Sequence, residues 1–208
     1  MTPPTPVVHV VDDDDSLRTA VMRLLRAAGY EVRGYPSAGE FMLARPGTMP
    51  GCVLLDVRMP GSSGLDLQVA FGEEDVGLPI IFLTGHGDIA MSVRAMKAGA
   101  VDFLTKPVKR ETLLNAVQTA LARDAENRSA RERAGVLRSH YETLTPRECA
   151  VFNLVVAGKL NKQIATELGT SERTVKSHRA QVMEKMHVDS LAELVHVAEH
   201  LQADGPRS

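Results

Sequence analysis

The chain has 208 residues, 44% of them hydrophobic and 24% charged, with a formal net charge of -2, a mixture typical of a globular protein with one large domain or two small ones. This near-neutral charge excludes a polyanion-coating protein and a disordered acidic tail. No apolar run approaches the roughly 18 residues of a membrane span, and MTPPTP at the start lacks the features of a signal peptide, so we expect a cytoplasmic protein without a membrane partner.

The first predicted element is a strand over residues 7–11, VVHVV, which runs directly into four consecutive aspartates. Two carboxylates at contact distance repel by about 1 kcal/mol in water and by more where water is excluded, so the cluster needs a counter-charge or solvation. We assign Asp14 and Asp15 to the following helix, because negative charge is stabilised at a helix N-terminus. Asp12 and Asp13 remain as candidate functional carboxylates.

Short apolar runs then alternate with helical patterns over the first 123 residues. The predicted strands after the first one are YEVRGY, GCVLLD, LPIIFLT and VDFLTKP. This alternation favours a doubly wound α/β fold, with a five-stranded parallel sheet of the flavodoxin-like kind and helices on both faces. Ligands of such sheets bind outside the carboxyl ends of the strands.

Polar side chains stand at the carboxyl ends of four of these strands. Asp12 and Asp13 follow the first strand, Asp56 the third, Thr84 the fourth and Lys106 the fifth. Carboxylate oxygens with room for water suit Mg²⁺, and a cation would relieve the crowding of the aspartates. Taken singly, each residue has an ordinary interpretation as a turn residue, a loop cap or a solvated charge. Their convergence favours a functional site that binds Mg²⁺.

Residues 124–142 mix charged residues with alanine. Asp124 and Arg128 have the i, i+4 spacing that supports a helix surface. We predict a solvated helical linker, with Gly135 as a candidate break.

The last third of the chain is predicted to contain four helices and no strand. Thr145, Pro146 and Glu148 fit a capping box at the start of the first helix, and Gly158 suits its end. The last helix, SLAELVHVAEHL, is expected to bury Leu191, Leu194, Val195 and Ala198.

The motifs VVDDDDS, LLDVRMPGSSG, FLTGHGD and DFLTKP resemble those of the receiver domain of two-component response regulators, over residues 5–123. The resemblance implies that a histidine kinase phosphorylates Asp56. It also implies that Asp13, Asp56 and the backbone carbonyl of Arg58 bind Mg²⁺ directly, and that Asp12 binds it through water.

The same resemblance assigns roles to residues around the phosphorylated aspartate. Lys106 would neutralise the phosphoryl group and Thr84 would hydrogen-bond it. These roles agree with the chemistry, because a carboxylate is a weak nucleophile. Phosphoryl transfer to it depends on cations that stabilise the negative charge on the phosphoryl oxygens during the transfer. Gly61 and Gly64 would permit tight backbone turns beside the site.

Phe103 occupies the position of the family's aromatic switch. Movement of Thr84 toward a phosphoryl group would vacate space for Phe103 and would change the surface of the predicted helix DIAMSVRAMKAG. That surface carries a stripe of Ile89, Val93 and Met96, for which burial in the core is the ordinary interpretation. A dimer formed on phosphorylation requires that this surface differ between two states.

The C-terminal region, about residues 144 to 186, resembles the LuxR-type helix-turn-helix through LTPRE, NKQIA and RTVKSH, within a small all-α domain over residues 143–204. The pairing of the two domains is FixJ-like, and it implies binding to double-stranded promoter DNA. From Lys162 to Lys185, basic residues outnumber acidic ones by only two, so one copy would have little non-specific affinity for DNA. This low affinity of a single copy is consistent with a protein that binds DNA as a homodimer.

Angular spacing of about 100° per residue orients the predicted recognition helix. The core side would carry Val175, His178, Val182 and Met186, and the opposite side Arg173, Lys176, Ser177, Ala180 and Glu184. Lys176, Ser177 and Ala180 are the expected base readers, whereas Glu184 should have left the groove. Phosphate contacts are expected from Lys162, Thr174, Arg179 and Lys185.

His196 and His200 stand at i, i+4, the spacing of a metal-binding pair. No third ligand stands nearby in the sequence, so ordinary surface histidines are the favoured interpretation.

The sequence therefore predicts a response regulator, not an enzyme, that is phosphorylated on Asp56, dimerises and binds promoter DNA, with RNA polymerase as a candidate further partner. An aspartyl-phosphate hydrolase of the haloacid dehalogenase kind would carry its nucleophile after the first strand, and here it follows the third. A transcription factor that acts independently of phosphorylation is the alternative. The complete set of receiver residues speaks against it.

Overall fold

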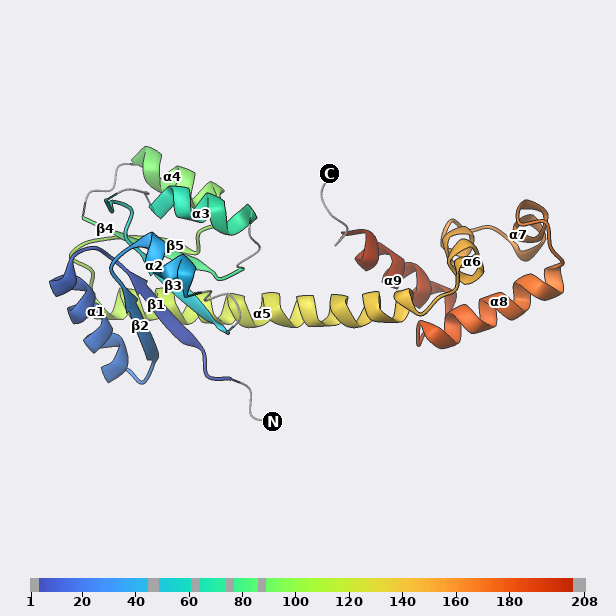
Figure 1. Cartoon of the computed structure of the whole chain (residues 1–208), viewed down its shortest axis with the longest axis horizontal. Coiled ribbons are helices and arrows are strands. Elements are labelled where there is room, and N and C mark those ends of the chain that lie inside the picture. Colours follow the sequence, from blue (N-terminus) through green and yellow to red (C-terminus); the bar gives the residue numbers. More distant parts are fainter. Residues whose placement is uncertain (1–3, 45–48, 61–63, 74–76, 86–88, 204–208) are drawn as a thin grey trace. The chain divides into compact units, whose positions relative to one another are not determined.

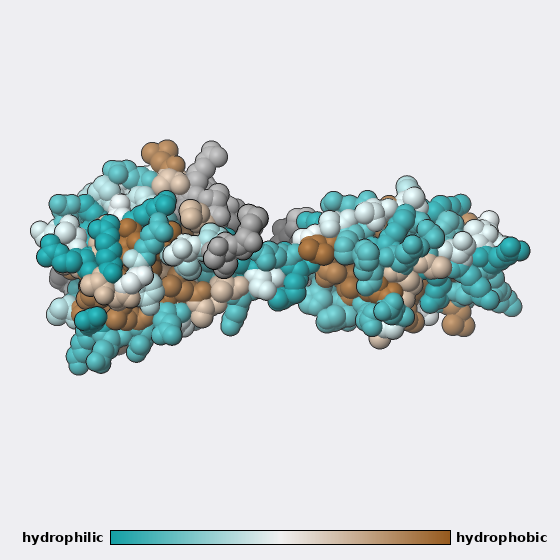
Figure 2. Space-filling view, turned by 90° about the horizontal axis from the view of Figure 1, so that it is seen from below, coloured by the Kyte–Doolittle hydropathy of each residue, from teal (hydrophilic) through white to brown (hydrophobic). Residues whose placement is uncertain are grey.

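Residues described by this computed structural model are 4–44, 49–60, 64–73, 77–85 and 89–203 (Figure 1). The chain divides into two compact units, Met1–Arg128 and Ser129–Ser208, and helix α5 (Arg110–Glu142) contributes residues to both. No helix in these described ranges is long and apolar enough to cross a membrane. Both units present a largely hydrophilic surface with smaller hydrophobic patches (Figure 2).

The first unit is built on a five-stranded parallel sheet. Its strands are β1 (Val7–Val11), β2 (Glu31–Tyr35), β3 (Gly51–Leu55), β4 (Ile80–Thr84) and β5 (Asp102–Thr105). They pair in the order β2-β1-β3-β4-β5, and every pairing is parallel. The predicted doubly wound α/β sheet is confirmed, with its switch point between β1 and β3.

Helices cover both faces of this sheet. Helix α1 (Asp15–Ala27) and the first part of α5 pack on one face, around Val8, Val10, Leu25, Leu113 and Val117. Helices α2 (Ala38–Leu43), α3 (Gly64–Glu73) and α4 (Ile89–Lys97) pack on the other, around Phe41, Val53, Leu55, Leu67 and Phe82. Strands β1, β3 and β4 are buried along their whole length, which explains their uninterrupted apolar sequences.

The aspartate run is divided as the sequence predicts. Asp14 is the N-cap of α1, where its Oδ1 accepts a hydrogen bond from Leu17 N at 3.0 Å, and Asp15 is the first helical residue. The assignment of these two residues to the helix is confirmed. Asp12 and Asp13 are left at the end of β1.

The second unit is helical throughout its described part. After the end of α5 it contains α6 (Pro146–Val156), α7 (Asn161–Glu167), α8 (Glu172–Lys185) and α9 (Leu191–Ala203), which confirms the four predicted helices. The capping box is present, because Thr145 Oγ1 accepts from Glu148 N at 3.3 Å and Glu148 Oε2 accepts from Thr145 N at 2.8 Å. Gly158 follows α6 with a φ of 80°, the left-handed conformation that favours glycine.

The predicted character of the linker is wrong at its start. Asp124 is only 2% exposed, and its Oδ2 accepts hydrogen bonds from Gly51 N at 2.8 Å and from Arg128 Nε at 2.9 Å. The pair does not stabilise a solvated helix surface, because α5 still packs on the sheet here and Asp124 satisfies the first amide of β3. Helix α5 also continues through Gly135 without a break.

The buried face of α9 differs from the predicted one. Leu194, Val197 and Ala198 are buried, whereas Leu191 is 45% exposed and Val195 is half-buried. Leu191 is the first residue of the helix, so it extends past the packed core although it shares the face of Leu194.

Candidate functional site

Acidic residues at the ends of two neighbouring strands lie together. Carboxylate oxygens of Asp12, Asp13 and Asp56 lie within 4.8 Å of one another. Strands β1 and β3 are adjacent, and Val11 is the register partner of Leu55. The residues that follow these two, Asp12 and Asp56, therefore lie next to each other at the same edge of the sheet. Asp12 and Asp56 are buried and Asp13 is exposed.

Lys106 reaches this cluster from the end of β5. Its Nζ donates to Asp12 Oδ2 at 2.7 Å and lies 3.4 Å from Asp56 Oδ1. The loop is held where Lys106 N donates to Thr84 O at 2.8 Å, and the Lys106–Pro107 peptide bond is cis. Asp12 Oδ1 accepts a further hydrogen bond from Asp14 N at 2.9 Å. Both oxygens of Asp12 are therefore hydrogen-bonded.

Asp56 is less well satisfied than Asp12. Its Oδ1 is buried and has no hydrogen-bond partner among the described residues, because the nearby ammonium group of Lys106 is within ion-pair distance but outside hydrogen-bond geometry. Burial raises the pKa of Asp56 above its ordinary value, Lys106 opposes this shift, and the charge of Asp12 adds to it. The carboxylate can therefore accept a further cation.

The donor set fits Mg²⁺ on structural grounds. Three carboxylates converge within 4.8 Å, and one of them has a buried oxygen that accepts no hydrogen bond from the described residues. Mg²⁺ prefers oxygen ligands and usually keeps several waters, which the exposed position of Asp13 permits. Arg58, whose carbonyl is a further predicted ligand, stands two residues after Asp56 in the same loop.

A close approach of the backbone shapes the loop that carries Asp56. A Cβ atom on Gly64 would lie 2.3 Å from Asp56 O, and Gly64 N donates to Val57 O at 3.0 Å. Gly64 has no left-handed φ, so it is needed for this contact at the start of α3 and not for a turn. Gly61 lies outside the described residues.

Thr84 and Phe103 lie on neighbouring strands. Thr84 is fully buried at the end of β4, and its partner in register on β5 is Thr105. Phe103 is half-buried, with its ring centroid 6.0 Å from that of Phe82. The predicted switch residue is therefore only partly covered.

The stripe on α4 is not part of the core. Ile89 is 84% exposed, and Val93 and Met96 are each 45% exposed. Ala95 of α4 is buried, and the half-buried Met91 also packs against the core. An apolar surface on one helix of the receiver unit is thus available for contact.

Sequence reasoning missed Gln68. This buried residue of α3 donates from Nε2 to Ala95 O and to Ala98 O, both at 3.1 Å, and so ties the end of α4 to α3. A glutamine in an apolar helix carries no local signal of such a role, because its partners are 27 and 30 residues away.

The predicted orientation of α8 agrees with the observed burial. Val175, Val182 and Met186 are buried and His178 is half-buried. Arg173, Lys176, Ser177, Ala180 and Glu184 are exposed on the other side. Ser171 caps the helix by accepting from Thr174 N at 3.1 Å, and its hydroxyl lies 2.9 Å from that of Thr174. The exposed face of α8 is available to a ligand.

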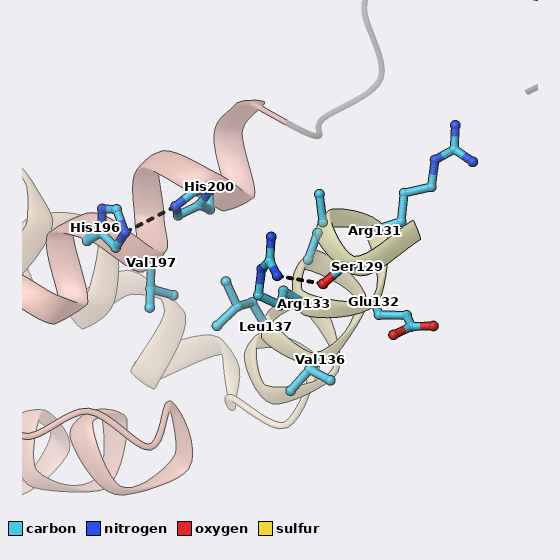
Figure 3. A pocket seen from close by; sticks show the side chains of 11 residues that line it. Ser129, Arg131, Glu132, Arg133, Val136, Leu137, His196, Val197 and His200 are labelled. Carbon is cyan, nitrogen blue, oxygen red and sulfur yellow. Dashed lines mark hydrogen bonds between the residues drawn. The ribbon is translucent and has the colours of Figure 1, made fainter. Parts of the chain in front are cut away.

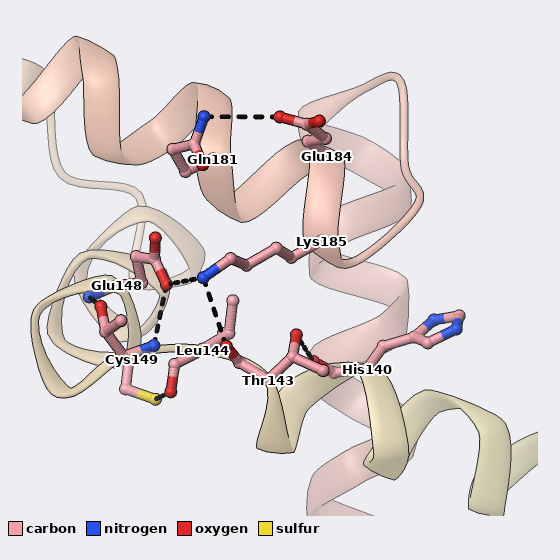
Figure 4. Close-up of polar contacts among 9 residues, drawn as sticks. His140, Thr143, Leu144, Glu148, Cys149, Gln181, Glu184 and Lys185 are labelled. Carbon is pink, nitrogen blue, oxygen red and sulfur yellow. Dashed lines mark hydrogen bonds and ion pairs between the residues drawn. The ribbon is translucent and has the colours of Figure 1, made fainter.

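The basic residues predicted to touch phosphate differ in their surroundings. Lys162 is exposed on α7, whereas Arg179 Nη1 donates to Asn161 Oδ1 at 2.8 Å and so links α8 to α7. Lys185 Nζ donates to Glu148 Oε2 at 2.6 Å and to a backbone carbonyl at the end of α5 (Figure 4). Its ammonium group already has two partners within the unit.

Two family models match the chain. The response regulator receiver domain matches residues 8–118, and the LuxR family of bacterial regulatory proteins matches residues 142–198. The chain belongs to the response regulator family. It combines a receiver domain with a LuxR-type DNA-binding domain, as the sequence predicts, and the expectation that it is not an enzyme is confirmed.

Individual relatives share both domains of this response regulator. Nodulation protein W of Bradyrhizobium diazoefficiens is 49% identical over 94% of this chain and 86% of its own. The structure of the response regulator StyR is 49% identical with a TM-score of 0.79, and covers 94% of this chain and 98% of its own. The structure of full-length FixJ from B. japonicum is 38% identical with a TM-score of 0.58, and it covers 96% of this chain and 98% of its own.

Membership of the family has direct implications. A receiver domain implies a histidine kinase as partner and an acidic pocket of the kind that binds Mg²⁺, and a LuxR-type domain implies DNA binding. The protein is therefore a two-component response regulator with a role in transcription regulation.

Proposed function

We propose that this response regulator accepts a phosphoryl group on Asp56 from a histidine kinase, then dimerises and binds promoter DNA in the cytoplasm. The buried Asp56 oxygen without a hydrogen bond, beside Asp12, Asp13 and Lys106, is the observation that carries the proposal. The receiver comprises residues 5–123, and the DNA-binding domain residues 143–204.

Residues in and around the acidic cluster have different roles in the proposed phosphoryl transfer. Asp13, Asp56 and the carbonyl of Arg58 would hold Mg²⁺ directly and Asp12 through water, and the ion supplies positive charge to the transferring phosphoryl oxygens. Lys106, already 3.4 Å from Asp56, turns from Asp12 to the phosphoryl group. Thr84 donates its hydroxyl to the same group.

The exposed stripe on α4 supports dimerisation as the result of phosphorylation. Movement of Thr84 makes room for Phe103, which is only half-buried, and the surface formed by Ile89, Val93 and Met96 then changes. Phosphorylation favours the dimer only through such a difference between two states.

The exposed face of α8 supports DNA binding. Lys176, Ser177 and Ala180 are its proposed base readers, near the N-terminal part of the helix. Phosphate contacts are assigned to Lys162, Arg173, Thr174 and Arg179. We leave Lys185 out of this set, because its ammonium group is engaged by Glu148. RNA polymerase remains a candidate partner of the DNA-bound dimer.

The test is incubation with acetyl phosphate and Mg²⁺, followed by intact-protein mass spectrometry. One phosphoryl group should be added to the parent chain and to Asp189→Asn, a control at an exposed aspartate of the second unit. Asp56→Asn or removal of Mg²⁺ should prevent the addition. Labelling that persists in Asp56→Asn would contradict the assignment.

Sedimentation and DNA binding of the phosphorylated chain decide between the proposal and its alternative. Phosphorylation should increase both self-association and affinity for promoter fragments. If neither changes, the protein is a transcription factor that acts independently of phosphorylation.

A further inference from the structure

Two histidine rings meet on the exposed side of α9. His196 and His200 are one helical turn apart, and their Nε2 atoms are 3.2 Å from each other. The ring centroids are 4.5 Å apart and the rings are close to perpendicular, at 85°. Figure 3 shows the two rings side by side, with a nitrogen of each directed at the other.

This separation suits two ligands of one metal ion. Imidazole nitrogens bind Zn²⁺ and similar ions at about 2.0 to 2.1 Å. Two nitrogens 3.2 Å apart at that distance from one ion subtend an angle of about 100° at the ion. The value lies between the angles of about 90° and about 109° of octahedral and tetrahedral coordination. No change of helix geometry is needed to bring the pair around an ion.

The surroundings leave room for additional ligands. Both histidines line a cavity of about 700 Å³ in the second unit, together with Val197 and with residues 129–134, 136 and 137 of α5. His196 is 72% exposed at its side chain, so water can complete the coordination of an ion there.

Charged groups of α5 face this cavity, and a carboxylate of α9 lies beside His196. On α5, Arg131 and Glu132 carry opposite charges, and Arg133 donates from Nη1 to Ser129 Oγ at 2.6 Å. On α9, Glu199 Oε2 lies 3.9 Å from Nδ1 of His196, on the nitrogen that does not face His200. At this distance, and with both side chains 72% exposed, the carboxylate adds little to cation binding at Nε2.

We propose that His196 and His200 form a binding site for a divalent transition-metal ion of the class that prefers imidazole, namely Cu²⁺, Ni²⁺ or Zn²⁺. Mg²⁺ is excluded from it, because that ion takes oxygen ligands and binds at the acidic cluster of the receiver instead. Two protein ligands leave positions open to water, so the ion is exchangeable.

Electron paramagnetic resonance of Cu²⁺ tests the proposal on the full-length chain. The protein is first saturated with Mg²⁺, so that the carboxylates of the receiver are occupied. One equivalent of Cu²⁺ should then give splitting from two nitrogen ligands. His196→Gln and His200→Gln, both at exposed positions, should each lose one nitrogen and bind at least about tenfold more weakly, because the second ligand acts at high effective concentration.

Glu199→Gln is the matched control, since it lies on the same exposed helix and leaves both imidazoles in place. It should keep the two-nitrogen spectrum and bind within about twofold of the parent. A spectrum with oxygen ligands alone would overturn the proposal. So would histidine variants that bind as tightly as the parent, or a tenfold loss shared by Glu199→Gln.

Discussion

The receiver and the C-terminal domain each bury a carboxylate, but they surround it differently. Asp56 of the receiver keeps an oxygen without a hydrogen-bond partner among the described residues, and burial raises its pKa. Glu148 of the C-terminal domain accepts from Lys185 Nζ at 2.6 Å and from Thr145 N at 2.8 Å, and these hydrogen bonds lower its pKa.

The difference separates the carboxylate that we propose to be phosphorylated from one that stabilises its domain. A buried carboxylate with an oxygen that lacks a hydrogen bond can gain from a cation and a phosphoryl group, whereas one already stabilised by an ammonium group and a backbone amide gains less. The C-terminal domain therefore keeps its buried charge for stability and places its proposed function on the exposed face of α8. The receiver instead has its proposed function at the buried carboxylate of Asp56.

The largest expected effect is on the loop that holds Asp56. Gly64→Ala should destabilise the receiver by about 3 kcal/mol, because the added Cβ meets a backbone oxygen at 2.3 Å that cannot move aside easily. Gly135→Ala is the control, since nothing lies within 4 Å of its Cβ and it is inside α5. It should stabilise the chain by about 1 kcal/mol. Urea unfolding measures both, and equal effects would contradict the role given to Gly64.

Substitution of exposed lysines on α7 and α8 should change DNA binding and leave stability unchanged. Lys176→Ala should reduce specific binding by roughly 1 to 3 kcal/mol, whereas Lys162→Ala should weaken all DNA sequences alike and lower the salt dependence by about one unit. Fluorescence anisotropy at several salt concentrations, with urea unfolding alongside, provides the measurements. An unchanged base preference in Lys176→Ala, together with a changed one in Glu184→Ala, would show that the helix is oriented differently.

The two domains should also respond to acid at different pH. Burial lowers the pKa of His9 in the receiver from 6.5 to about 4, so its neutral form stabilises the fold, and this stability is lost as pH falls from 6.5 toward about 4. The loss should reach about 2 kcal/mol near pH 5. Glu148, with its lowered pKa, stabilises the C-terminal domain until pH falls below its ordinary value of 4.5.

Hydrogen exchange followed by mass spectrometry resolves the two domains in that experiment. The receiver should lose protection first, and His9→Gln should remove the loss of stability that protonation of His9 causes above pH 4.5. Simultaneous loss in both domains would show that these two residues do not set the order.

The smallest effect is expected at the ion pair of the C-terminal domain. Lys185→Met should destabilise this domain by about 1 kcal/mol, because a charge on a side chain that is 29% exposed is removed and Glu148 keeps its hydrogen bond from Thr145. Glu148→Gln/Lys185→Met should recover part of the loss, since no unpaired charge then remains buried. A double-mutant cycle by thermal unfolding checks the coupling, and strictly additive losses would contradict it.

Much of the fold could be predicted because its signals are local. The strands of a sheet covered on both faces appear as apolar runs such as VVHVV and GCVLL, and the capping box of Thr145 and Glu148 involves residues three positions apart. The orientation of α8 followed from helical periodicity, which needs no knowledge of the rest of the chain.

Parts of the candidate site could not be predicted in this way. The sequence indicated that Asp12, Asp56 and Lys106 converge, but not that Lys106 hydrogen-bonds Asp12 and leaves Asp56 incompletely paired. The two carboxylates are chemically alike, and their difference comes from the position of the Lys106 ammonium group and from the Asp14 amide, which both donate to Asp12.

The amino-acid sequence by itself determined the order of the elements, the helix caps, the strand-end residues of the receiver and the buried side of α8. Only the tertiary structure decided that Asp124 is buried against β3, that Gln68 ties α4 to α3, and that Lys185 pairs with Glu148. Each of these contacts joins groups between 27 and 73 residues apart, so its formation depends on how whole elements pack and leaves no pattern in the neighbouring residues.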